Sequence, residues 1–463
     1  MKKSLILTLL LTLCIAGGAA YAAADIWIQH DAVTFRQNIL TGDPSDAEGL
    51  AVRMLIYERY NQFWDVTHTM GADMQTDAAY EYTILSDSDR VMGLSKKESN
   101  WISLHTKSKS AALYKNELNP DELPEEYRDL AENYTEGGHN AKTVKMQELM
   151  KYYPIFADLE LPDIHASWND NHYLSSVNNR SDNGAMARAL EKEFQDYFRI
   201  PVPEDAAAVY SIQHTGSHYK LNLEYTRSDI PNFICTSAVT EDACYFAFHS
   251  DNFDTEKLDT SQIKGGFGIY KLPYSSEDGI LPELSTIYRL TPAAEIQHLE
   301  ISPSGDVLQL HTRENGQYMI TFIDLATGEA LQKLSAGDEN TIKNHWDVIT
   351  GEDWILLQNG RFEYILISRR ADGTYAETLH LNIPESEVPW DEEKANAITA
   401  TSDGSRIALA SNTYSYFYDG GDFFTAIYGA DGLNYYAEYE SSLSIKESRG
   451  NFIGTANLTL EWN

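Results

Sequence analysis

Two pairs of histidines come nearest to metal chemistry in type and spacing. His214 and His218 lie on either side of a predicted hairpin turn, and His165 and His172 lie in one polar segment. Imidazole nitrogens are good zinc ligands, but a zinc site takes three or four ligands from the protein. The first pair has no third ligand beside it in the sequence. Acids and amides surround the second pair, but this pattern is no more diagnostic of a metal site. The sequence predicts no metal site and no cofactor.

Motifs of nucleophilic catalysis give no stronger signal. Ser261 and Lys264 match the Ser-x-x-Lys pattern of penicillin-recognising enzymes, but the chain has no Lys-Thr-Gly motif to complete it. Gly265 and Gly266 follow without the Gly-Lys-Ser/Thr sequence of a phosphate-binding loop, so they indicate a turn. With 70 Asp and Glu residues in the chain, no catalytic carboxylate pair can be singled out. We predict no catalytic residue.

An aromatic cluster near the C-terminus is the best candidate for recognition. Exposed tyrosines offer a rigid ring with a hydrogen-bonding tip, which suits contacts with glycans or proteins. The alternative is packing, because alternate aromatic residues on strands also fill the space between sheets. The candidate residues are Tyr414, Tyr416, Tyr418, Tyr435 and Tyr436.

The first 24 residues have the pattern of an export signal. Lys2 and Lys3 precede a run without charge at residues 5–20, and residues 20–22, Ala-Tyr-Ala, fit the small-x-small rule for cleavage. Residues 5–24 also have the length of about 20 residues that a membrane anchor needs. We expect residues 1–24 to be either a signal peptide or an N-terminal membrane anchor. The rest of the chain then lies outside the cytoplasm, secreted or tethered to the cell membrane.

The charge of the chain excludes one class of partner. The formal net charge is −35 at pH 7, and so acidic a surface repels the phosphate backbone of nucleic acids. We expect a monomer that meets the membrane only through its N-terminal segment and whose partner is an extracellular protein, peptide or glycan.

The two cysteines beyond the N-terminal segment lie close together in the sequence. Cys235 and Cys244 are in two β-rich runs that flank residues 240–242, which predicts a hairpin with the two sulfurs nearly opposite each other. Because disulfides persist in oxidising compartments, we expect a cross-strand disulfide. Two buried free thiols are the alternative. A redox-active pair is not expected, because eight residues separate the cysteines.

A weak internal repeat in the last 170 residues predicts the fold. Segments that begin at His298, Trp346 and Ala397 each join two β-type runs by a polar turn, at Gly305, Gly351 and Gly404. Repeats of about 40–50 residues with several strands each are typical of β-propellers. We predict a mainly β fold, a β-propeller of six or seven blades over residues 25–463. The clearest blades are expected at 233–290, 296–336, 344–383 and 395–440.

Residues 119–201 interrupt the strand pattern. Asn119-Pro120 indicates a helix start, residues 143–153 a second helix, and an apolar stripe from Met186 to Phe198 a third. We expect an α-helical insertion here, which either covers the propeller or forms an independent domain that carries the activity. The alternating residues 456–463 are expected to pair with an N-terminal strand and close the ring.

Two turns of the repeat resemble a known group of proteins. Residues 302–308, Ser-Pro-Ser-Gly-Asp-Val-Leu, and 402–409, Ser-Asp-Gly-Ser-Arg-Ile-Ala-Leu, look like the turns of bacterial WD40-, YVTN- and TolB-type propellers, and residues 324–329 resemble their inter-strand turn. The resemblance covers about a third of the chain and carries over no catalytic residue. It implies a fold with interaction surfaces, so we expect an exported or membrane-tethered binding or sensing module that recognises a protein, peptide or glycan. The alternative is an extracytoplasmic hydrolase that acts on glycans through carboxylates at the propeller mouth.

Overall fold

The computed structural model divides into two compact units. One unit joins Met1–Lys97 to Asn344–Asn463, and the other is the intervening segment Glu98–Lys343. Along the chain, the second unit is therefore inserted into the first. The residues that the structure describes are 12, 14–18, 33–58, 60, 62–83, 87–88, 90, 101–106, 113–117, 119–134, 139–161, 164–168, 174–177, 183–215, 218–225, 230–250, 258–275, 279–338, 347–359, 362–384, 395–412, 421–443 and 453–462.

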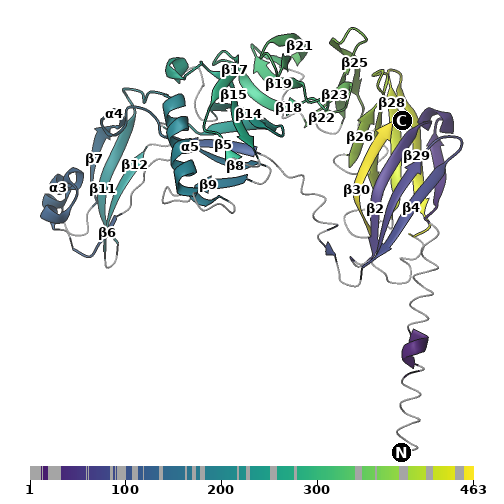
Figure 1. The fold of residues 1–463 in the computed structure, drawn as a ribbon, viewed down its shortest axis with the longest axis horizontal. Coiled ribbons are helices and arrows are strands. Elements are labelled where there is room, and N and C mark those ends of the chain that lie inside the picture. The colour runs from purple at the N-terminus through teal and green to yellow at the C-terminus, as the bar shows by residue number, and fades with distance from the viewer. Residues whose placement is uncertain are drawn as a thin grey trace, which may run out of the picture. The chain divides into compact units, whose positions relative to one another are not determined.

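The first unit contains three antiparallel sheets (Figure 1). Sheet 1 has the strand order β30-β2-β3-β4, sheet 6 the order β22-β23-β24-β25, and sheet 7 the order β1-β29-β28-β27-β26. One turn of 3-10 helix, η1, follows β1. The elements are β1 (Phe35–Thr41), η1 (Pro44–Ala47), β2 (Leu50–Glu58), β3 (Gln62–Thr69), β4 (Gln75–Tyr82), β22 (Asp347–Thr350), β23 (Trp354–Asn359), β24 (Glu363–Arg369), β25 (Tyr375–Asn382), β26 (Ala397–Ala400), β27 (Arg406–Asn412), β28 (Phe423–Gly429), β29 (Gly432–Ser441) and β30 (Ile453–Trp462).

The second unit contains four antiparallel sheets. Sheet 2 has the order β10-β9-β8-β5, sheet 3 the order β6-β12-β11-β7, and sheet 5 the order β18-β19-β20-β21. Sheet 4 consists of β13, β14, β15 and β17, with β16 paired to the end of β15. The strands are β5 (Trp101–Thr106), β6 (Leu113–Lys115), β7 (His139–Lys145), β8 (Ile155–Leu161), β9 (Ile164–Trp168), β10 (Leu174–Val177), β11 (Ala207–Thr215), β12 (His218–Tyr225), β13 (Phe233–Val239), β14 (Ala243–Ser250), β15 (Gly268–Ser275), β16 (Gly279–Ile280), β17 (Ser285–Arg289), β18 (Glu295–Ile301), β19 (Val307–Glu314), β20 (Gln317–Asp324) and β21 (Ala330–Asp338).

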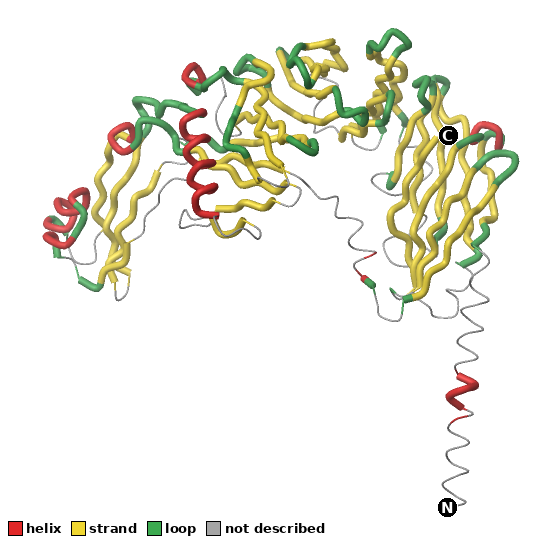
Figure 2. Tube along the Cα trace, viewed as in Figure 1, coloured by secondary structure: helices red, strands yellow, loops and turns green. Residues whose placement is uncertain are grey.

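The helices of the second unit lie between these strands. Figure 2 shows α5 alongside the strands of sheet 2, and the buried residues Phe194 of α5 and Phe198, which directly follows the helix, pack against Phe246 of sheet 4. One aromatic core thus joins the helix to two sheets. The helices are η2 (Pro120–Glu122), α3 (Glu125–Glu132), α4 (Met146–Leu149), α5 (Asn183–Tyr197) and η5 (Thr260–Gln262).

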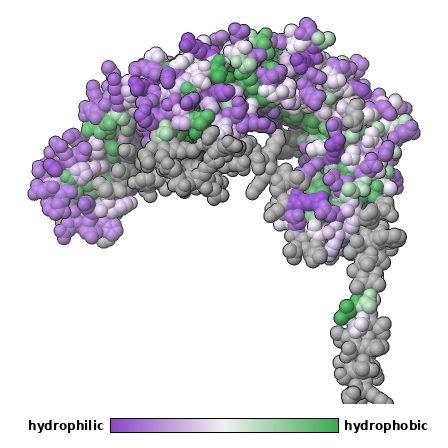
Figure 3. Space-filling model, viewed as in Figure 1, coloured by the Kyte–Doolittle hydropathy of each residue, from purple (hydrophilic) through white to green (hydrophobic). Residues whose placement is uncertain are grey.

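The prediction of a mainly β, propeller-type fold is confirmed. The described residues form seven antiparallel sheets, and sheets 4 to 7 each contain a four-stranded meander, the unit from which propeller blades are built. Sheets 4, 5 and 6 coincide with the expected blades 233–290, 296–336 and 344–383, and β26–β29 of sheet 7 coincide with 395–440. Hydrophilic side chains cover most of the surface in view (Figure 3), as the composition requires.

The two terminal parts of the first unit complete each other's sheets. The C-terminal strand β30 pairs with β2, as expected, and adds the outermost strand to sheet 1. In return, β1 pairs with β29 and becomes the outermost strand of sheet 7. A shared core that includes Trp64, Ile56, Phe423 and Tyr439 lies between the two sheets. Each exchanged strand therefore pairs with the strand that would otherwise be the edge, β2 or β29, and lengthens the sheet over the shared core.

The repeated turns have the same hydrogen bonds in two sheets. Ser302 donates its backbone N–H to the carbonyl of Val307, and its hydroxyl accepts the N–H of Val307 at 3.2 Å. Thr401 and Arg406 make the same two bonds in sheet 7, with a distance of 3.1 Å for the second. Gly404 has a positive φ of 69°, a conformation that suits glycine. The turn after β22 is different, because Gly351 bonds directly to Trp354 in a tighter connection.

The segment 119–201 is only partly helical. It contains η2, α3 and α5, but the expected helix at 143–153 is the end of β7 followed by the single turn α4. Strands β7 to β10 also lie in this segment, and they belong to sheets 2 and 3. The polar strand β7, His-Asn-Ala-Lys-Thr-Val-Lys, has no apolar alternation that would have revealed it. The helical insertion is therefore corrected to two interleaved sheets with helices attached.

The expected disulfide is wrong for this structure. The hairpin at Thr240–Asp242 forms as predicted, but its register pairs Cys235 with Phe248 and Cys244 with Val239. The two cysteines are thus four positions apart along the strands, about 13 Å at the rise of a β-strand, whereas a disulfide needs Cα atoms within about 7 Å of each other. Both are free thiols. Burial raises the pKa of both, that of Cys235 to about 12, which keeps them protonated and unreactive.

The predicted N-terminal signal or anchor, residues 1–24, lies largely outside the described residues. Of that segment only residues 12 and 14–18 are described, and they are helical. Among the residues that the structure describes, no helix combines the length and the apolar character needed to span a membrane.

A matched pair of glycines tests the packing of the repeated turn. In Gly404→Ala a new Cβ would lie 2.1 Å from Oγ of Ser368, whereas in Gly373→Ala, at φ +84°, it would meet nothing within 4 Å. Both variants carry the strain of a left-handed alanine, about 1 kcal/mol. We expect Gly404→Ala to lose at least about 1 kcal/mol more than Gly373→Ala in denaturant unfolding. Equal losses would contradict the contact between the turn and sheet 6.

Candidate binding surface

The predicted recognition tyrosines do not form a surface site in the described residues. Tyr414, Tyr416 and Tyr418 lie outside them. Tyr435 and Tyr436 lie on β29 and are buried, with exposed fractions of 0% and 7%. The recognition role is therefore wrong for these two residues, and the packing alternative holds for them.

Tyr435 belongs to a hydrogen-bonded network inside the first unit. Its hydroxyl lies 2.8 Å from that of Tyr439, and the side-chain amide of Gln37 donates to both hydroxyls. Burial raises the pKa of Tyr435 and of Tyr439. Gln37 comes from β1, so this network also fixes the exchanged strand against β29.

The histidine pairs do not assemble a metal site. His214 packs against Tyr219 on one face of sheet 3, while His218 packs against Tyr114 on the other face. The two imidazoles therefore point away from each other. The side chain of His165 and the whole of His172 lie outside what is described. Among the described residues no group of three His, Cys, Asp or Glu side chains is arranged to hold a metal ion.

Two other histidines are buried as neutral groups. His68 of β3 is 1% exposed, with Nδ1 2.8 Å from the hydroxyl of Thr76 and its ring against Phe423 and Tyr439. Burial lowers the pKa of His68 to about 4. His311 of β19 is fully buried beside Tyr318, and burial holds its pKa well below the ordinary value. Both have a structural role in this environment, because a neutral imidazole packs where an imidazolium does not.

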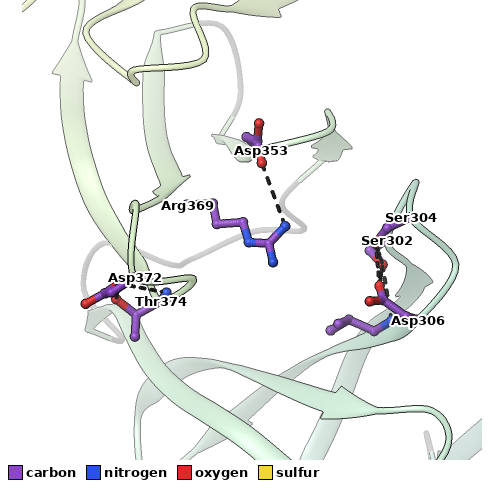
Figure 4. Close-up of polar contacts among 8 residues, drawn as sticks. Ser302, Ser304, Asp306, Asp353, Arg369, Asp372 and Thr374 are labelled. Carbon is purple, nitrogen blue, oxygen red and sulfur yellow. Dashed lines mark hydrogen bonds and ion pairs between the residues drawn. The ribbon is translucent and has the colours of Figure 1, made fainter.

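The carboxylates with displaced pKa values belong to turns or surface pairs. Among the described residues, five aspartates have a displaced pKa, and in all five it is lowered by hydrogen bonds. Figure 4 shows Asp372 accepting the hydroxyl and N–H of Thr374, and Asp306 accepting the hydroxyl of Ser304 in another turn. Such bonds stabilise turns. A general acid needs the opposite, a raised pKa. The displaced aspartates are Asp43, Asp196, Asp324, Asp372 and Asp403.

The nearby ion pair of Arg369 and Asp353 is also a surface contact. Its atoms are 3.9 Å apart and its side chains are 46% and 49% exposed (Figure 4). An exposed pair of this kind contributes at most about 1 kcal/mol. It gives no sign of a reactive centre.

Sheet 3 presents polar side chains on the face that α3 does not cover. Helix α3 covers the other face, where Tyr127 meets Tyr210 edge-on at 5.1 Å and Leu130 packs near Ile212 and Leu221. Successive side chains of a strand point to opposite faces, so the neighbours of Tyr210, Ile212 and Leu221 along their strands lie on the face away from α3. We call the side away from α3 the open face. It carries Tyr114 of β6, His218, Lys220, Asn222 and Glu224 of β12, Val209, Ser211 and Gln213 of β11, and His139, Ala141, Thr143 and Lys145 of β7.

The open face is polar and accessible. Ser211 and Asn222 at its centre are buried among their neighbours, and Val209 and Lys220 are half-buried. The remaining residues are exposed, Tyr114 by 60%. Figure 3 shows hydrophilic residues over the part of the second unit that carries α3 and sheet 3.

One row of side chains crosses all four strands of the open face. The register places Tyr114 opposite Lys220, Lys220 opposite Gln213, and Gln213 opposite His139. We call these four residues the cross-strand row. With about 4.8 Å between neighbouring strands, the row spans about 14 Å. Among the described residues, none of the four makes a hydrogen bond or ion pair with another side chain; Tyr114, Gln213 and His139 are exposed and Lys220 is half-buried.

The sequence contains little that points to this surface. Tyr114 and Lys220 are 106 positions apart in the sequence, and β6 has only three residues. The only local signal is the alternation in β12, where Lys220, Asn222 and Glu224 separate apolar residues. It indicates one polar face but not its partners.

Comparisons with known proteins add a fold-level likeness and no function. No protein-family model matches the chain, and no curated protein does. Solved structures that match include β-propellers. A putative 6-phosphogluconolactonase from Bacteroides fragilis is 9% identical, with 85% of this chain and 95% of that one covered and a TM-score of 0.28. The β-propeller domain of the Trilobed protease from Pyrococcus furiosus is 12% identical, with coverages of 50% and 67% and a TM-score of 0.23.

A third match is the periplasmic gluconolactonase of Pseudomonas aeruginosa. It is 11% identical, covers 64% of this chain and 81% of its own, and has a TM-score of 0.25. At such scores the individual likenesses carry no weight for the site. The assignment of the architecture rests on the sheets themselves.

The buried neutral His68 predicts a pH dependence of stability. Its pKa of about 4 in the folded state lies below the ordinary 6.5, so the unfolded chain binds more protons as the pH falls. The stabilisation is fully present above pH 6.5 and is lost as the pH falls towards 4, by on the order of 3 kcal/mol. Denaturant titrations from pH 7 to pH 4 measure it. We expect His68→Gln, whose side chain does not titrate, to have a shallower loss than the parent; parallel curves would show that His68 is not responsible.

Proposed function

We propose that the chain is an exported, non-catalytic binding module whose ligand binds on the open face of sheet 3. The observation that supports it most is the cross-strand row, in which three exposed residues and one half-buried residue place an aromatic ring, an amide, an imidazole and a cation side by side. Recognition surfaces combine such exposed aromatic and hydrogen-bonding groups. The uncharged run after Lys2 and Lys3 supports export.

The open face is held by a rigid scaffold, which suits binding. Tyr210, Ile212 and Leu221 are fixed against α3 on the far side, so the strands that present the row cannot shift easily. A preorganised surface loses less conformational entropy when a ligand binds. The propeller-type sheets of the chain then serve as the support for an attached recognition sheet.

The hydrolase alternative has less support. It requires a carboxyl group with a raised pKa near a second carboxylate. In the part of the chain that the structure describes, the displaced carboxyl pKa values are all lowered, and each has a local cause. No specific observation favours the alternative.

Binding to a printed array tests the proposal. The array carries neutral polysaccharides, uronic-acid polysaccharides and synthetic peptides, and it is probed with the chain lacking residues 1–24. We expect retention on at least one class, reduced at least about fivefold in Tyr114→Ala/Gln213→Ala because stacking and hydrogen bonds are lost. Tyr82→Ala, which removes a tyrosine that is 44% exposed on β4, is the control and keeps the signal. Equal retention of all three proteins, or none, counts against this surface.

Fractionation of cells tests the localisation. We expect a chain expressed with residues 1–24 to be found outside the cytoplasm, and N-terminal sequencing to give a start near residue 23 for a cleaved signal or Met1 for a membrane anchor. A chain with residues 2–20 deleted serves as the cytoplasmic control. Recovery of both in the cytoplasm contradicts export.

A further inference from the structure

The charge of the open face is unlike that of the chain as a whole. The chain has 35 Lys and Arg residues against 70 Asp and Glu residues, but the open face carries two lysines, Lys145 and Lys220, against a single carboxylate, Glu224. The amide of Asn222 lies 3.4 Å from this carboxylate. Glu224 is also remote from the cross-strand row, because the register places it beside Val209, four positions along β11 from Gln213.

The row itself therefore contains no carboxylate and one permanent cation. Lys220 is half-buried, and the register places it between Tyr114 of β6 and Gln213 of β11 on the same face. His218 lies at the same end of the sheet, with its ring 6.3 Å from that of Tyr114 and nearly perpendicular to it. A carboxylate or sulfate of a ligand would find in this corner the positive charge that is scarce elsewhere on the protein.

The uncharged groups of the row suit the remainder of a sugar ring. The exposed face of Tyr114 offers a flat apolar surface against which the C–H face of a sugar can stack. Gln213 has two amide donors and an acceptor, and the His139 imidazole adds another polar group, both placed to meet hydroxyls. The length of the row matches a short oligosaccharide lying across the strands.

A peptide fits the same face less well. Peptide recognition commonly uses an apolar pocket or a free sheet edge for main-chain hydrogen bonds. The cross-strand row has one aromatic residue and no second apolar anchor, since Lys220, Gln213 and His139 make up the rest of it. Charge and composition together favour a glycan.

We propose that the cross-strand row binds an acidic glycan, with Lys220 as the partner of the ligand's anionic group and Tyr114 as the stacking platform. This inference rests on the proposed function and specifies its ligand class. A negative ligand also agrees with the choice of this face, because a chain of net charge −35 repels an anion nearly everywhere else.

Calorimetric titration with matched ligands provides the test. The probes are galacturonate, guluronate and glucuronate-containing oligosaccharides, their methyl esters, and a poly-glutamate peptide of similar length and charge. We expect at least one acid oligosaccharide to bind at least about tenfold more tightly than its neutral ester, a difference that shrinks as salt is added because ionic contacts are screened.

Variants on the two faces of one sheet separate the ionic contact from a general effect of charge. Lys220→Gln should weaken the acid oligosaccharide about fivefold and leave its ester unchanged, whereas Tyr114→Ala should weaken both. Lys142→Gln is the matched control, since Lys142 lies on the helix-covered face near Asp129, at 3.8 Å. It should bind as the parent does, and circular dichroism confirms that all variants are folded.

Three results would overturn the inference. One is equal affinity for an acid oligosaccharide and its ester on the same face, which makes a neutral glycan the ligand and leaves the proposed function standing; Lys220→Gln binding like the parent likewise removes Lys220 as the partner of the anionic group. Another is tighter binding of poly-glutamate that also depends on Lys220, which makes the partner an acidic peptide. The last is acid binding that survives Tyr114→Ala/Gln213→Ala unchanged, which removes the proposed function together with its ligand.

Discussion

The structure of the first unit depends on backbone pairing between segments from opposite ends of the sequence. β30 pairs with β2 and β1 pairs with β29, so sheets 1 and 7 each receive a strand from the far end of the chain. Without these two strands, both sheets would present open edges, and the core around Trp64 and Phe423 would lose part of its cover. The network of Gln37 with Tyr435 and Tyr439 adds side-chain bonds to the same closure. The insertion of the second unit is possible because this closure holds the two halves of the first unit together.

The strands and turns that are neighbours in the sequence could be predicted from local alternation of apolar and polar residues and from turn residues. Sheets 4 to 6 and the strands β26–β29 of sheet 7 consist of neighbours in the sequence, and short β-type runs separated by turns are the local pattern of such strands. The turns at Ser302 and Thr401 share their hydrogen bonds although only part of their sequence is shared, so the repeat is a repeat of backbone geometry. The closure by β30 was also predictable, because alternation in residues 456–463 marks a strand that needs a partner.

The remaining features depend on information that local pattern lacks. Cys235 and Cys244 share a hairpin, but its register follows from the turn at 240–242, and that register separates them. Tyr435 has the appearance of a recognition residue in sequence, yet its strand lies inside a pair of packed sheets. The segment 119–201 contains strands that pair with β5 and β11, one before the segment and one after it. For the same reason the cross-strand row, assembled from four strands, was not found from the sequence.

The position of β30 has a consequence for how the chain is made. Strands β2 to β4 are synthesised early, but the partner that covers the edge of β2 is synthesised only after the whole of the second unit. Sheet 1 therefore remains incomplete during most of synthesis, while the second unit, whose pairings are all internal, can fold independently. The first unit can therefore close only late, in a step that follows the synthesis of the second unit.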